Sequence, residues 1–291
     1  MENSGDLPAG SPPTLGDCPV LPADNPWNSD VRSLPRHPRS AEFIASIGGS
    51  GGNGLLHADF GGNLEYGIPF ITVPASEPKV PIQWTAYGDQ SDPGPYPIPL
   101  NAPIEGGSDR HVLSLQQTTC KLHELFAAEP AANRWKAASG AIFDLHSNAL
   151  RPEGWTSADA GGLPIFVGLA RCAEVEAGEI NHALRFTVSR SQKGYIHPAT
   201  HWASNTDSPN DPPMGLRLRL KAGYDISGYH GQARVILEAL RKYGMIVADN
   251  GTSWFITGAR ESCWDDEDLN QLKEVPGTAF EAVKTGPIIK D

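Results

Sequence analysis

Short apolar runs separated by turn residues dominate the chain, and this pattern predicts strands rather than long helices. Several runs alternate apolar and polar residues over a strand length, as in "HVLSL" (111–115) and "GLRLRLKAGYDI" (215–226). The Asn-Gly pair between "MIVAD" and "SWFITG" predicts a strand–turn–strand unit over 245–258. Further strands are expected at 69–73, 80–85, 121–126, 140–145, 163–170 and 182–189.

One segment has the helical period. From Gln232 to Tyr243 the apolar residues Val235, Ile236, Ala239 and Leu240 form a single stripe, and Gly244 supplies the stop. Shorter helices are expected at 41–48 and 264–275. Strands and helices do not alternate regularly, so we predict an all-β dominated fold. The expected architecture is a single-domain, two-sheet β-sandwich of jelly-roll type over 18–291, with a few peripheral helices and a disordered N-terminal tail over 1–17.

Composition narrows the class of protein. The chain has 291 residues with 39% hydrophobic content, enough for a core at this size. A net charge of -11 argues against a nucleic-acid partner, which would need a basic surface. No apolar run approaches the roughly 20 residues that a membrane span requires. We therefore expect a monomer that neither binds nucleic acid nor inserts into a membrane.

The four cysteines indicate whether the protein works in a reducing or an oxidising compartment of the cell. Cys18, Cys120, Cys172 and Cys263 lack C-x-x-C spacing, which argues against a structural zinc site. Their even number allows two disulfides in any of three pairings, or four free thiols. The start, "MENSGDLPAGSPPTLGD", has no signal-peptide pattern. The chain is therefore cytosolic, or its signal peptide has been replaced by an initiator Met; we favour the second and expect a secreted protein.

The first candidate for chemistry is "PIEGGSDRHVL" (103–113), which carries Glu105, Asp109 and His111 around a Gly-Gly pair. Alternate residues of a strand share a face, so Asp109 and His111 would point the same way. A carboxylate beside an imidazole fixes its tautomer and raises its pKa, which suits acid–base work. The alternative is a polar turn in which Asp109 pairs with Arg110.

A second candidate is the connection "SNALRPEGWTSAD" (147–159), with Asn148, Arg151, Trp155 and Asp159. An aromatic ring beside directional polar groups is typical of sugar recognition, because the ring covers C–H faces while polar groups bind hydroxyls. Asp92, in the long Pro/Gly/Asp segment 88–107, is a further acid. A packed loop with a buried Trp155 is the alternative.

A third group contains His182 and Arg185 in "NHALRF", with His197 and His201 in "HPATH". The spacing of the last two binds zinc on a helix, but Pro198 disfavours a helix there and no Glu follows His197. His111, His182 and His201 could instead form a three-histidine metal site across strands. The chain contains no P-loop and no G-x-S-x-G elbow.

Several strings of the chain resemble a family of uncharacterised secreted bacterial proteins, found mainly in soil actinobacteria. The resemblance covers residues 18 to about 285, and "LRPEGWTSADAGGLPI" (150–165) is its most distinctive string. It implies export and a single domain, and it supplies no catalytic residues. The chain departs from the family pattern in "YIHPATH", where a Trp is expected at His197 and an Arg at Thr200, so His201 is the better candidate for a role.

We therefore expect a secreted glycoside hydrolase that acts on a polysaccharide or oligosaccharide without a cofactor. Its carboxylates would come from Asp92, Glu105, Asp109 and Asp159, with His111 and His182 adjusting protonation. The residues expected to bind substrate are Asp92, Asn148, Arg151, Trp155, Arg185 and His201. Two alternatives stay open: a lyase or divalent-metal enzyme built on His111, His182 and His201, and a non-catalytic cell-wall or glycan-binding module.

Overall fold

Four β-sheets form the framework of the computed structural model, which describes residues 14–48, 54–58, 60–61, 63 and 65–290. Strand accounts for 25% of the structure and helix for 17%, so the expected dominance of strands holds, although the fold is mixed rather than all-β. Of the predicted N-terminal tail, residues 1–13 lie outside the described residues, and Thr14–Leu15 form strand β1.

The largest sheet has six strands and curls into a half-barrel. In spatial order it contains β15 (Phe280–Ala282), β12 (Arg217–Leu220), β13 (Met245–Asn250), β11 (Leu184–Val188), β14 (Phe255–Ile256) and β3 (His57–Ala58). Strands β11 and β13 are parallel. A parallel pair needs a crossover connection, and the chain makes it through β12 and helix α3 (Gly231–Lys242).

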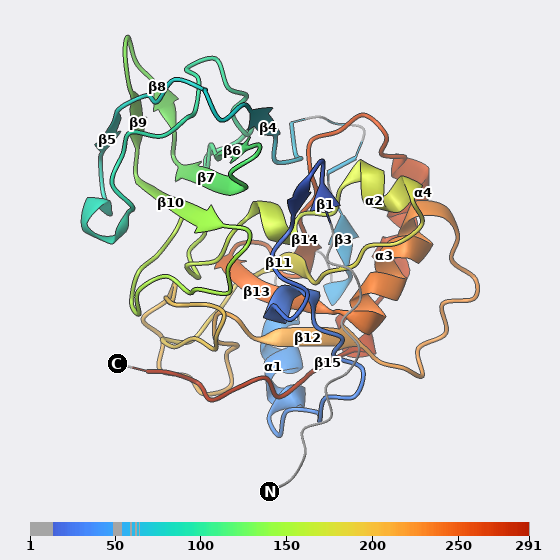
Figure 1. The fold of residues 1–291 in the computed structure, drawn as a ribbon. Helices are drawn as coiled ribbons and strands as arrows, with labels where there is room; N and C mark the ends of the chain where they lie inside the picture. Colours follow the sequence, from blue (N-terminus) through green and yellow to red (C-terminus); the bar gives the residue numbers. More distant parts are fainter. Residues whose placement is uncertain (1–13, 49–53, 59, 62, 64, 291) are drawn as a thin grey trace, which may run out of the picture.

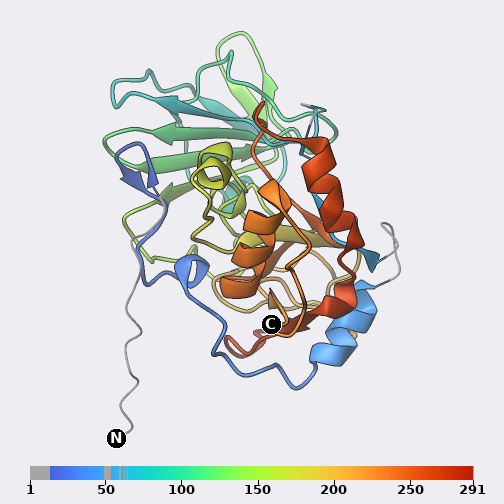
Figure 2. The same cartoon turned by 90° about the vertical axis from the view of Figure 1, so that its right-hand side faces the viewer.

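The other three sheets are smaller. One has the order β10 (Ser139–Asp144), β7 (Lys121–Phe126), β6 (Val112–Gln116) and β4 (Phe70–Val73); another has β5 (Ile82–Trp84), β9 (Trp135–Ala137) and β8 (Glu129–Pro130); β1 pairs with β2 (Cys18–Pro19). Figures 1 and 2 place β4–β10 at one end of the molecule and helix α1 (Ser40–Ile47) at the other. A separate small hydrophobic core around Tyr96 and Trp135 fills the end that contains β4–β10.

The jelly-roll prediction is wrong. The structure has four sheets rather than two, and three strand pairs of its larger sheets, β11–β13, β14–β3 and β4–β6, are parallel. Alternation of apolar and polar residues tells which side chains face the core, but it does not tell which strands pair. The remaining helices are α2 (Cys172–Glu176) and α4 (Asp266–Asn270), with short 3₁₀ turns at Pro26–Asn28, Gly88–Gln90, Phe166–Gly168, Gln271–Glu274 and Gly277–Ala279.

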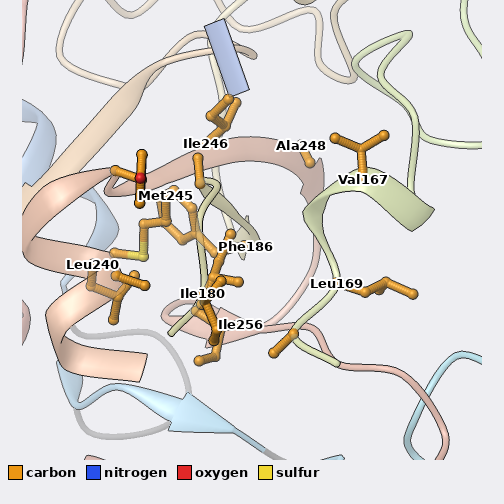
Figure 3. Packing of buried hydrophobic residues seen from close by; sticks show 14 of the residues in the cluster. Val167, Leu169, Ile180, Phe186, Leu240, Met245, Ile246, Ala248 and Ile256 are labelled. Atoms are coloured by element: carbon orange, nitrogen blue, oxygen red, sulfur yellow. The ribbon is translucent and has the colours of Figure 1, made fainter. Parts of the chain in front are cut away.

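Helix α3 confirms the predicted helical stripe to within one residue at each end. Its buried residues pack against the six-stranded sheet, and Figure 3 shows Leu240 beside Met245 of β13 and near Phe186 of β11. Gly244 then turns the chain with a φ of 72°. A Cβ at Gly244 would lie 2.1 Å from the carbonyl oxygen of Leu218, so only glycine fits between the helix and its sheet.

One predicted strand is a 3₁₀ turn instead. The segment 163–170 is fully buried, but Phe166–Gly168 forms a short helix. Pro164 has no N–H to give to a ladder, and the N–H groups of Ile165 and Phe166 donate to the carboxylate of Glu124 at 3.0 and 2.9 Å. The buried carboxylate of Glu124 thus accepts the backbone hydrogen bonds that a neighbouring strand would otherwise accept from this apolar segment.

The cysteines form two disulfides, Cys18–Cys120 and Cys172–Cys263. The first joins β2 to the turn between β6 and β7, and the second joins α2 to the segment before α4. Two disulfides are consistent with an oxidising compartment. Within the described residues, no helix has the length and apolar character needed to cross a membrane.

Candidate functional site

A pocket of about 380 Å³ collects charged residues from segments that are far apart in the sequence. Its charged lining residues are Glu105, Asp109, His111, Arg185 and Asp249. Phe60, Tyr66 and Phe255 add aromatic rings to the walls. Four of the five charged residues were candidates from the sequence, and Asp249 was not.

Glu105 and His111 form a tight pair at the pocket. The Oε2 atom of Glu105 lies 2.5 Å from Nδ1 of His111 and also accepts from the His111 backbone N–H at 3.2 Å. The other ring nitrogen lies 3.1 Å from the carbonyl oxygen of Ala158. Because both ring nitrogens face acceptors, the doubly protonated imidazolium fits this position.

The pKa values of this pair move apart. Burial alone would lower the pKa of His111, but the hydrogen bond and charge of Glu105 raise it above its ordinary value. Burial would likewise raise the pKa of Glu105, but His111 holds it below its usual value. Glu105 is therefore an ionised carboxylate at neutral pH, with 15% of its side chain exposed.

Arg185 is held beneath the pocket by Asp159. Two parallel contacts of 2.8 Å join Nε and Nη2 of Arg185 to the carboxylate oxygens of Asp159, which is fully buried. The third guanidinium nitrogen donates to the Oγ1 atom of Thr257 at 2.7 Å. Burial would lower the pKa of Arg185, but the charge of Asp159 and the hydrogen bonds to it raise it. Asp159 thus positions Arg185 and does not itself reach the pocket.

Asp249 is the penultimate residue of strand β13 and lines the same pocket. Its Oδ2 atom lies 3.9 Å from Nη2 of Arg185, and 24% of its side chain is exposed. Burial and the negative charge of Asp159 raise the pKa of Asp249 to about 7, and Arg185 offsets only part of that rise. A carboxyl group of this kind is largely protonated in mildly acidic solution.

A β-bulge explains why Asp249 points into the pocket. The register of β11 against β13 shifts after Phe186, so that Asp249 pairs with Thr187. Without the shift Asp249 would pair with Val188, which is buried in the core. Thr187 and Arg185 are two residues apart and share the pocket face, so the bulge brings Asp249 to their side.

The remaining candidates from the sequence take no part in the contacts described so far. Asp109 lines the pocket but is exposed, and the carboxylate beside His111 is that of Glu105 rather than that of Asp109, as the sequence suggested. His182 is fully buried, with Nε2 3.0 Å from Nη2 of Arg171 and 3.1 Å from Glu174. Burial would raise the pKa of Glu174, but the charges of Arg171 and His182 lower it to about 2. His182 therefore belongs to a separate structural cluster, and its predicted catalytic role has no support from this position.

Most of the second sequence candidate forms a cluster away from the pocket, whereas its Asp159 pairs with Arg185. Nη1 of Arg151 lies 2.5 Å from Oδ2 of Asp92, and the guanidinium stacks 5.8 Å from the ring centroid of Trp155. Asn148 bonds to Asn25 and Asp24 near the chain start. These contacts hold the 147–157 loop in place, and Trp155 is half-buried there rather than buried as the packed-loop alternative expected.

The three-histidine metal site does not form. His111 contacts Glu105, His182 contacts Glu174, and Nδ1 of His201 lies 2.9 Å from the carbonyl oxygen of Ala160. No group of three or more potential side-chain ligands suited to a metal ion occurs among the residues that the structure describes. The exposed His197 bonds to Glu153 instead.

The pocket thus combines an ionised carboxylate, a carboxyl group with a pKa near 7 and a fixed guanidinium with aromatic rings, of which that of Tyr66 is exposed. The protonated carboxyl group can donate a proton. The ionised carboxylate can accept a proton or act as a nucleophile, and the guanidinium can stabilise negative charge. Asp249 and Tyr66 are the residues that sequence reasoning missed. For Asp249 a signal existed, since it is a carboxylate at the end of an apolar strand. Comparisons of the chain with protein-family models, curated proteins and solved structures found no match.

Proposed function

We propose that this pocket is the active site of a secreted glycoside hydrolase, with Asp249 as the proton donor and Glu105 as the ionised partner. Glycosidases need two carboxyl groups in opposite protonation states on either side of the bond that is cleaved. One observation supports the proposal above the others: Glu105 and Asp249 line one pocket while their surroundings move their pKa values in opposite directions.

Each neighbour has a role in the proposed chemistry. Asp249 would protonate the departing oxygen, and Glu105 would attack the sugar or activate a water molecule. His111 keeps Glu105 ionised through the 2.5 Å contact. Arg185, fixed by Asp159, stabilises the carboxylate that forms when Asp249 gives up its proton.

The aromatic residues fit a sugar as well as an acid–base pair. Tyr66 and Phe255 present ring surface in the pocket, and apolar C–H faces of pyranose or furanose rings pack against such surfaces. The two disulfides agree with a protein that works outside the reducing cytosol. We therefore place the proposed activity on extracellular polysaccharides or oligosaccharides.

The test is turnover on a panel of plant, fungal and bacterial glycans, followed by Asp249→Asn and Glu105→Gln. Each substitution should lower kcat by about 10²–10⁴. The control is Asp144→Asn, which makes the same change at an exposed ion pair with Lys121. Full activity in Asp249→Asn contradicts the assignment of roles. Glycan binding by the wild-type protein without any turnover identifies a binding module instead.

A further inference from the structure

We propose that the substrate is a chain of several sugar units that extends from the pocket described above, past Tyr66, into a second pocket. This inference rests on the proposed function and adds that the enzyme recognises an oligomer or polymer rather than a single terminal unit. It is carried by two cavities that share one residue, and that residue is Tyr66.

The second pocket has a volume of about 360 Å³, comparable with the first. Each is within the lower part of the range of known ligand sites. Its polar lining comes from Asn63 and, on and after helix α4, from Asp266, Asn270 and Lys273. Amide, carboxylate and ammonium groups placed together offer both donors and acceptors, which suits hydroxyl groups.

Tyr66 marks the boundary between the two pockets. It is the most exposed large hydrophobic side chain in the described part of the chain, with 64% of its surface accessible. A ring this exposed gains little from packing in the free protein. Placed between two polar cavities, it instead offers a flat surface for a sugar ring that bridges them.

The loop that carries Tyr66 is fixed against the loop that carries Glu105. A Cβ at Gly106 would lie 2.6 Å from the carbonyl oxygen of Glu65, so the two loops touch backbone to backbone. Arg260 ties them together, since its guanidinium donates to the carbonyl oxygens of Gly67 and Ile104 at 3.3 and 3.1 Å. The backbone that carries Tyr66 is therefore held beside the loop of the proposed catalytic carboxylate, while its ring stays exposed.

The charges favour a neutral chain. In the first pocket Glu105 and Asp109 face His111 and Arg185, with Asp249 titrating near pH 7. Among the described residues that line the second pocket, Asp266 is the one acid and Lys273 the one base. The described lining of neither cavity has the excess of cationic groups that a polyuronate or sulfated glycan would need.

The test measures binding separately from turnover. The Asp249→Asn variant is titrated with gluco-, xylo-, manno- and arabino-oligosaccharides of two to six units, by calorimetry and saturation-transfer NMR. For the glycan that binds, affinity should rise at least tenfold between two and four units. Tyr66→Ala in the same background should remove that gain, Tyr66→Phe should keep it, and Asn270→Ala should weaken only the longer chains.

Equal affinity for short and long chains, no binding of any of these chains, or an unchanged gain in Tyr66→Ala overturns the inference. The two proposals fail in different ways. Length-dependent binding without hydrolysis by the wild-type protein overturns the proposed function and leaves the two-pocket inference standing. Hydrolysis with no dependence on chain length does the reverse.

Discussion

Replacing Asp159 by Asn tests how the buried charges set the chemistry of the pocket. Asp159 is fully buried, and it makes both of its 2.8 Å contacts with Arg185, itself 5% exposed. Asn has nearly the same shape but no charge. The variant therefore leaves the guanidinium with the carboxylate of Asp249 at 3.9 Å and the more distant charge of Glu105.

The magnitude follows from burial. Removing one partner of a buried ion pair costs about 3–5 kcal/mol of unfolding free energy. A chain of 291 residues has an unfolding entropy of about 0.6 kcal/mol/K, so the melting temperature should fall by about 5–8 °C. Asp144→Asn breaks an ion pair whose partners are 39% and 41% exposed, and it should cost less than about 1 kcal/mol, or about 2 °C.

The same variant should move a pKa. The charge of Asp159 helps to raise the pKa of Asp249 to about 7, and Asp159 also competes with Asp249 for Arg185. Without that charge the pKa of Asp249 must fall from about 7 toward its ordinary value of 3.8. The protonated form of Asp249 is the proposed acid, so the alkaline limb of kcat/KM should move to lower pH.

Two measurements check this reasoning, differential scanning calorimetry and the pH profile of kcat/KM on the best glycan. A melting temperature that falls no further than in Asp144→Asn would show that the buried pair contributes little. An alkaline limb that stays in place or moves upward would refute the electrostatic link between Asp159 and Asp249. Lowering the pH toward the new pKa of Asp249 separates loss of the protonated acid from loss of folded protein, since only the first is reversed as the pH falls.

Three further predictions concern the surroundings of the pocket. Gly106→Ala should lower kcat/KM at least tenfold, because its Cβ would lie 2.6 Å from the Glu65 carbonyl oxygen. Gly223→Ala is the neutral control, since no atom lies within 4 Å of its Cβ position. Equal activities of the two variants would contradict the loop contact. The disulfides join cysteines that are 102 and 91 residues apart in the sequence. Reduction and alkylation of either should lower the free energy of unfolding by about 4.7 kcal/mol and the melting temperature by about 7–8 °C. An unchanged melting temperature would show that the bond does not stabilise the fold. His182→Gln should lower stability while leaving the pH profile of activity unchanged, and a shifted profile would return His182 to the chemistry.

Local features of the fold were predictable from the sequence, and long-range pairings were not. The stripe of Val235, Ile236, Ala239 and Leu240 with Gly244 behind it is a local pattern, and α3 follows it. The parallel pairing of β11 with β13 depends on a crossover through β12 and α3, and nothing in either strand encodes it. The jelly-roll prediction failed for this reason.

The candidate site shows the same division. Glu105, Asp109 and His111 were singled out together because they lie in one short segment, but the sequence paired the imidazole with Asp109, whereas Glu105 contacts it. Asp249 was missed because its direction depends on one extra residue in β13, which a regular alternation does not reveal. Trp155 was assigned to the pocket from composition alone, and its contact with Arg151 places it in another cluster.

The disulfide pairing has a consequence for how the chain is made. In sequence order the first cysteine pairs with the second and the third with the fourth, so the two covalent loops neither overlap nor enclose one another. A chain that emerges from its N-terminus can therefore close each bond as soon as the later partner appears. The first bond can be complete before Cys172 is exposed, so neither of the two other pairings need arise as an intermediate. We therefore expect formation of the two bonds to depend on an oxidant rather than on an isomerase that exchanges wrongly paired cysteines.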